Sequence, residues 1–317
     1  MTRDTTNPAA LPRATTTTTT HAPAQQPPRP TSTNPLSKPR ILCLHGGGTN
    51  ARIFKAQCRV LSRVLDPWFR LVYAEAPFES QPGPDVLSVY ADCGPFKRWL
   101  RWKPEHAAIT DEDVVAAIDE ALAEAMSEDD DAGATGEWVG LLGFSQGAKL
   151  AASLMFRQQV LLASPGGLAQ GRDNNKNSTG TSIRPLLSPV EWKFAILHAG
   201  RAPLVNLLGE ATFSSSLLSR PSQIGLADKP DDSGHHVPHD IMDVASGKHM
   251  LDLPTVHVHG LQDVGIHLHR DLLDTYCTPG SAVLVEWDGA HRMPLKAGDV
   301  QLVVDAMLAV AAETGAI

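Results

Sequence analysis

Residues 137–149 read EWVGLLGFSQGAK, and the arrangement of the other segments can be inferred outward from this run. The apolar residues 138–142 are too few for a helix and are typical of a strand buried on both faces. Gly143-Phe144-Ser145-Gln146-Gly147 follows as a G-x-S-x-G pattern and leads into a helix-like stretch over 148–156. A Cβ at either glycine would clash where the strand folds back into the helix, which leaves Ser145 exposed in a strained turn. The alternative is a glycine-rich turn that holds a serine by chance, but the flanking strand and helix argue against it.

The composition narrows the class of protein. The 317 residues, 42% of them hydrophobic, suffice for one large α/β domain or two smaller ones. The strand-turn-helix unit around Ser145 favours one large domain. Beyond residue 40 the chain carries 22 basic and 34 acidic residues, which argues against nucleic acid or an anionic membrane as partner. Its four cysteines lack a C-x-x-C pair, and no signal core or membrane-length apolar run is present. We therefore expect reduced thiols and a cytoplasmic location.

Irregular segments divide the chain. Residues 1–38 contain six consecutive threonines and a Pro/Gln-rich stretch, which predict a disordered tail, with a transit peptide as the alternative. Residues 39–317 form the predicted domain, with insertions near 78–108, 164–190 and 219–252. The last of these is long enough to fold over a site.

The first strand of that domain ends in a glycine run. Residues 39–45, PRILCLH, are followed by Gly46, Gly47 and Gly48, so the backbone there can approach a ligand closely. With an exposed serine nearby, we expect the N–H groups of Gly47 and Gln146 to form an oxyanion hole. A phosphate cradle is the alternative, but neither phosphate-binding glycine motif is present.

The next segments predict a helix over 51–65, a strand over 70–77 and a helix that opens at Thr110 with a capping box. Between them, the aromatic residues Phe96, Trp99 and Trp102 either wall an acyl pocket or pack on their own core. The acidic run 128–131 is interpreted as a solvated loop.

Partners for Ser145 follow in the order that α/β-hydrolases use, which is serine, acid, histidine. Asp263 comes directly after a predicted strand over 254–260, and His291 follows another over 281–287. Because the carboxyl ends of parallel strands share one edge, all three side chains are expected to meet there. Asp288 precedes His291 by only three residues and is better suited to stabilising its loop. The sequence thus predicts an α/β-hydrolase with a doubly wound, mostly parallel sheet and a Ser145, Asp263, His291 triad.

Histidines also suggest a metal site. His257 and His259 share one strand face and, with His267 and His269, could hold zinc, but no H-E-x-x-H motif or cysteine partner accompanies them. We expect neither a metal nor another cofactor.

Five motifs together make the chain similar to a known family, and they lie at 41–50, 92–102, 143–147, 257–263 and 291–294. Over about residues 40–308, the chain resembles the fungal serine hydrolase family of α/β-hydrolases. Within it, the chain is similar to the branch that accompanies polyketide synthases, which includes the lovastatin-pathway thioesterase. In that family the matching serine, aspartate and histidine form the triad. The resemblance implies hydrolysis of a thioester that tethers a polyketide to an acyl carrier protein.

Other functions stay open. A general short-chain carboxylesterase would need the same residues, and a non-catalytic acyl-binding protein would keep the fold without turnover. A basic cluster, Lys97, Arg98, Arg101 and Lys103, is either a rim for the carrier's phosphopantetheine arm or a solvated face.

Overall fold

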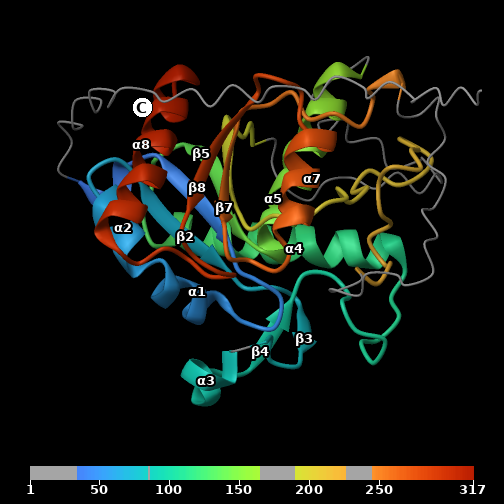
Figure 1. Ribbon diagram of the computed structural model, residues 1–317, viewed down its shortest axis with the longest axis horizontal. Coiled ribbons are helices and arrows are strands. Elements are labelled where there is room, and N and C mark those ends of the chain that lie inside the picture. The colour runs from blue at the N-terminus through green and yellow to red at the C-terminus, as the bar shows by residue number, and fades with distance from the viewer. Residues whose placement is uncertain (1–33, 85, 165–189, 226–244) are drawn as a thin grey trace, which may run out of the picture.

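A parallel six-stranded sheet forms the centre of the computed structural model, which describes residues 34–84, 86–164, 190–225 and 245–317 (Figure 1). Its strand order is β2-β1-β5-β6-β7-β8, and each neighbouring pair is parallel. The strands are β1 (Arg40–Leu44), β2 (Arg70–Ala74), β5 (Trp138–Phe144), β6 (Phe194–His198), β7 (Thr255–Gly260) and β8 (Ala282–Trp287). The predicted α/β-hydrolase architecture is confirmed.

Helices cover both faces of this sheet (Figure 1). One face carries α1 (Ala51–Gln57), α2 (Arg59–Leu65) and α8 (Ala297–Glu313), and the other carries α4 (Asp111–Asp131), α5 (Gln146–Ala163) and α7 (Ile266–Tyr276). Because side chains alternate along a strand, Ile41 and Cys43 enter the first core while Leu42 and Leu44 enter the second. Among the described residues, no helix combines the length and the apolar character that crossing a bilayer requires.

Short elements fill the segment between β2 and α4. They are β3 (Phe78–Ser80), α3 (Val86–Tyr90), the 3-10 turn η2 (Ala91–Cys93) and β4 (Phe96–Arg98). β3 and β4 pair antiparallel, with Phe78 opposite Arg98. The predicted insertion is therefore an ordered excursion rather than a continuous loop.

Two predicted boundaries are wrong. The helix expected over 51–65 is two helices, because Cys58 leaves the helical conformation (φ −81°, ψ 2°); Phe54 of the first helix and Leu61 of the second pack into the same core. Residues 34–38, assigned to the tail, contain the 3-10 turn η1 (Pro35–Ser37), whose Leu36 carbonyl accepts from the N–H groups of Thr135 and Gly136. Residues 1–33 of the tail, and 165–189 and 226–244 of the predicted insertions, lie outside the described residues.

The acidic run is also not a solvated loop. Helix α4 continues through Asp131, and Asp129 is buried, where it accepts hydrogen bonds from Arg70 Nε at 2.9 Å and Nη2 at 2.6 Å. The guanidinium of Arg40 lies 3.4 Å from Asp129 and also contacts Asp130. These ion pairs fasten the end of α4 to the first residues of β1 and β2.

We expect Asp129→Ala to lower the free energy of unfolding by about 3 kcal/mol, since it leaves the buried Arg40 without its buried partner. The exposed neighbour Asp131→Ala is the matched control and should change it by less than about 0.5 kcal/mol. Urea denaturation followed by circular dichroism measures both values. Equal midpoints for the two variants would contradict a structural role of Asp129.

Candidate active site

Ser145 occupies the tight turn between β5 and α5. Its φ of 54° lies in the left-handed region, which is unusual for a residue with a side chain. A Cβ at Gly147 would overlap the carbonyl oxygen of Leu44 in β1, and one at Gly143 would overlap the backbone of Ala148. The turn is held in place by the Ser145 N–H, which donates to the His198 carbonyl at the end of β6 (2.8 Å). Both glycines are therefore required sterically, as the sequence predicted.

The loops after β7 and β8 are tied to each other. The N–H of Leu261 donates to the Trp287 carbonyl and that of Gln262 to the Gly289 carbonyl, each at 2.9 Å. The side chain of Gln262 also donates to Asp288 (2.6 Å), which agrees with the interpretation of Asp288 as a loop-stabilising residue. These bonds set Asp263 and His291 at a fixed separation on the sheet edge.

The three residues predicted as a triad meet at this edge. His291 Nδ1 lies 2.5 Å from Asp263 Oδ2, and His291 Nε2 lies 3.0 Å from Ser145 Oγ. The second carboxylate oxygen of Asp263 accepts the N–H of Gly265 at 2.9 Å. An unbroken hydrogen-bonded chain thus runs from the acid through the imidazole to the hydroxyl.

The charge of Asp263 determines which atoms donate and which accept in these hydrogen bonds. Burial alone would raise the pKa of Asp263, but the hydrogen bond and charge of His291 outweigh it and lower the pKa to about 2. The ionised carboxylate is an acceptor, so the proton on His291 lies on Nδ1 and Nε2 presents a lone pair to the Ser145 hydroxyl. His291 packs against the Phe144 ring, 5.0 Å between centroids, and keeps a third of its side chain exposed.

The glycine loop lies beside the turn. A Cβ at Gly47 would come within 3.2 Å of the Gln146 side chain, which places the two predicted oxyanion residues next to each other. The N–H of Gly48 donates to the Lys97 carbonyl at 2.8 Å. Among the described residues, no backbone or side-chain group accepts from the N–H of Gly47 or of Gln146.

The side chain of Gln146 has a role that the sequence did not reveal. Its Oε1 accepts the N–H groups of Trp99 (2.8 Å) and Leu100 (3.1 Å), and its Nε2 donates to the Leu100 carbonyl (3.0 Å). This amide fastens the segment after β4 to the start of α5. The position after the serine in a G-x-S-x-G pattern gave no indication of such a long-range contact.

Trp99 takes the second of its two predicted roles. Its side chain is fully buried, and Nε1 donates to the His45 carbonyl at 3.0 Å, so it supports the glycine loop and cannot wall an open pocket. His45 is a structural hydrogen-bonding residue, because its ring is buried and its Nε2 accepts the N–H of Ala76 (3.1 Å). Phe96 and Trp102 are half-buried.

The basic cluster is not a uniform charged rim. Arg98 is buried, with its guanidinium 4.9 Å from the centre of the Phe78 ring. Arg101 donates to the Pro104 carbonyl, and Lys103 lies 4.5 Å from the centre of the Trp102 ring. Lys97, Arg101 and Lys103 keep partial exposure.

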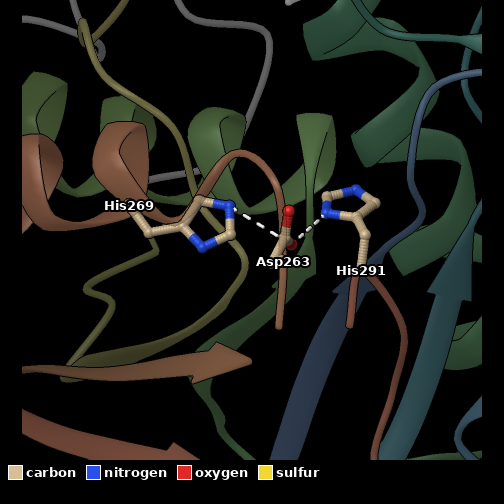
Figure 2. Close-up of side chains that lie close together, drawn as sticks. All are labelled: Asp263, His269 and His291. Atoms are coloured by element: carbon tan, nitrogen blue, oxygen red, sulfur yellow. Dashed lines mark hydrogen bonds and ion pairs between the residues drawn. The ribbon is translucent and has the colours of Figure 1, made fainter. Parts of the chain in front are cut away.

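Three side chains have donor atoms within 4.8 Å of one another, and they are Asp263, His269 and His291 (Figure 2). The 2.5 Å between Asp263 and His291 is shorter than the roughly 3.3 Å between two ligands of one tetrahedral zinc ion. As arranged, these two groups bond to each other. Of the histidines first considered for zinc, His267 is exposed on α7, away from the buried His257, His259 and His269.

Buried histidines surround the site. Burial lowers the pKa of His198, His257 and His269 to about 3 and that of His259 to about 4. In the unfolded chain each would titrate near pH 6.5. Between these values the unfolded state binds more protons than the folded state. The contribution of these rings to stability is therefore fully present above about pH 6.5 and decreases as the pH falls toward 4.

We expect His257→Asn to make this loss shallower by about 1.4 kcal/mol per pH unit, the contribution of one proton. His267→Asn, on the exposed side of α7, should leave the slope unchanged. Urea unfolding at pH 8, 6, 5 and 4.5 measures the slopes. The burial argument would fail if wild type kept its full stability down to pH 4.5.

Comparisons with known proteins agree with this geometry. A family model described as "Serine hydrolase (FSH1)" matches residues 33–303. Esterase GME11355 of Pestalotiopsis microspora is 48% identical over 280 residues, which cover 88% of this chain and 94% of the relative. Esterase pigG of Monascus ruber is 50% identical over 281 residues, with the same two coverages, and esterase dbaE of Emericella nidulans is 51% identical over 282, covering 88% and 93%.

Proposed function

Because the chain belongs to the serine hydrolase family FSH1, and is thus a hydrolase acting on ester bonds, we propose that Ser145, His291 and Asp263 perform its reaction. The observation that carries this assignment is the continuous hydrogen-bonded chain from Asp263 Oδ2 to Ser145 Oγ. Ser145 is the nucleophile, His291 the general base, and Asp263 the acid that fixes the imidazole tautomer.

Acylation begins when Ser145 Oγ attacks the acyl carbonyl and His291 Nε2 takes the hydroxyl proton. The imidazolium that forms is stabilised by the ionised Asp263. The carbonyl oxygen becomes an oxyanion, which the N–H groups of Gly47 and Gln146 bind. Both N–H groups suit this role because no described group accepts a hydrogen bond from them. Gly47 lies on the glycine loop, and Gln146 lies at the N-terminus of α5.

Collapse of the intermediate expels the alcohol or thiol, which receives the proton from His291. Water then attacks the acyl-serine while His291 takes its proton, and a second collapse releases the acid and returns the proton to Ser145. No cofactor is required by these steps. The free enzyme is restored with the base neutral.

We further propose that the acyl group is a polyketide held as a thioester on an acyl carrier protein. The support is the resemblance of the five motifs to the polyketide-associated branch of the family, together with the fungal esterases whose sequences are 50% and 51% identical to this chain. A general short-chain carboxylesterase is the second candidate, since it needs the same hydrogen-bonded chain. Phe96 and Trp102, both half-buried, stay candidates for contact with the acyl chain. We place the enzyme in the cytoplasm, where the four free cysteines would stay reduced.

Ser145→Ala should lower kcat by about four orders of magnitude or more without changing the fold, because the nucleophile is lost while the turn keeps its small side chain. Wild type and variant are compared on p-nitrophenyl esters and acyl-pantetheine thioesters of two to twelve carbons. Serine-dependent preference for long thioesters supports polyketide release, and preference for short oxygen esters supports the carboxylesterase. Undiminished turnover by the variant would show that another residue is the nucleophile.

Carrier recognition would use the partly exposed Lys97 and Lys103. Lys97 is adjacent to the glycine loop, since its N–H and carbonyl bond to Thr49 and Gly48. The double variant Lys97→Glu, Lys103→Glu should raise KM for a carrier-bound acyl group about tenfold, through repulsion of the phosphate of the carrier's phosphopantetheine arm. Lys55→Glu, an exposed charge on α1, is the control. Equal effects on carrier-bound and free thioesters would refute recognition by this surface.

A further inference from the structure

Asp263 lies between two imidazoles (Figure 2). His291 binds its Oδ2 from one side at 2.5 Å, and His269 Nε2 approaches the same oxygen from the other side at 3.6 Å. The side chains of Asp263 and His269 are both fully buried. Neither ring nitrogen of His269 has a hydrogen-bond partner in the part of the chain that the structure describes.

Local backbone geometry delivers His269 to this place. Asp263 Oδ1 accepts the N–H of Gly265, the residue that precedes α7. The Asp263 carbonyl accepts the N–H of Ile266, so the helix starts directly on the loop that holds the carboxylate. His269 is then one turn into α7 and faces back toward Asp263 (Figure 2), whereas His267 is exposed.

A row of imidazoles supports His269 from behind. Ring centroids are 5.9 Å apart for His257 and His259, 5.5 Å for His259 and His269, and 6.1 Å for His269 and His291. Cys277 closes the far end, with Sγ 3.4 Å from His257 Nε2. The buried carboxylate therefore meets packed rings on this side, and His269 cannot move away from it without displacing them.

The charge state of His269 suits a donor. Burial outweighs the attraction of Asp263 and lowers the pKa of His269 to about 3, so its ring is neutral at physiological pH. A neutral imidazole offers one N–H and adds no full positive charge to compete with the His291 imidazolium for Asp263. The other charged or titratable groups that act on His269 are His259, His291 and Arg201.

We propose that His269 is a positioning residue of the hydrolase, whose Nε2–H fixes the orientation and charge of Asp263 while His291 accepts the proton of Ser145. This rests on the triad proposed above. At 3.6 Å the contact is longer than a hydrogen bond, and catalytic bonds of this kind tighten when charge develops. The dipole of His269 stabilises the carboxylate anion, and so moderates the pull of Asp263 on the His291 proton.

The test compares His269→Leu, which removes the donor, with His269→Gln, whose amide Nε2 reaches a similar position. For the leucine variant we expect a kcat about tenfold lower with KM unchanged. We also expect the acid limb of its kcat/KM profile to move to higher pH, because Asp263 then holds the His291 proton more strongly. The glutamine variant should keep kcat within about twofold of wild type. His267→Leu, two residues away and exposed, is the matched control and should be unchanged.

A folded leucine variant with wild-type kcat and an unmoved acid limb would overturn the proposal. So would equal impairment of the leucine and glutamine variants with unmoved limbs, which indicates a purely structural role. If the leucine variant does not fold, His269→Asn replaces it, because its amide is too short to reach Asp263. Ser145→Ala in the same assay keeps the two proposals apart: turnover without Ser145 refutes the nucleophile, whereas loss of turnover with indifferent His269 variants refutes the positioning role alone.

Discussion

The left-handed backbone at Ser145 is the constraint on which the rest of the structure depends. A side chain in that region costs about 1–3 kcal/mol, so the surrounding contacts must impose it. They do so through three strands: Gly147 touches the Leu44 carbonyl of β1, the turn continues β5, and the Ser145 N–H is taken by β6. The strained residue is consequently built into the centre of the sheet, where a local rearrangement would disturb the neighbours on both sides.

A second constraint, on the glycine loop beside Ser145, explains the excursion between β2 and α4. A glycine loop that must present a free N–H cannot hold itself in place with those groups, so its conformation has to be enforced by other residues. Trp99 binds the His45 carbonyl, Lys97 binds Gly48, and the Gln146 amide clasps Trp99 and Leu100. Part of the aromatic segment that the sequence offered as a substrate wall thus holds the glycine loop in place.

These contacts also show what a sequence can and cannot predict here. Short apolar runs predicted the parallel strands, and the chain order of serine, acid and histidine placed Ser145, Asp263 and His291 on one edge, because strand ends and glycine turns are local features. Asp129 in an acidic run was misassigned, the role of Trp99 was left open between two alternatives, and the contacts of the Gln146 side chain were missed. The role of each depends on partners tens of residues away, and the local sequence pattern does not identify those partners.

Burial of Asp263 links catalysis to stability. A buried carboxylate needs donors around it, yet in the proposed mechanism any full positive charge beside it would compete with the imidazolium that it stabilises. A neutral imidazole avoids that competition, and His269 places one 3.6 Å from Asp263 while β7 packs His257 and His259 behind it. These buried histidines have lower pKa values in the folded state than in the unfolded chain, so acid protonates them more readily when the chain is unfolded. This difference lowers the stability at low pH. The predicted sensitivity to acid then follows from keeping Asp263, the carboxylate proposed to orient His291, buried and ionised beside neutral imidazoles.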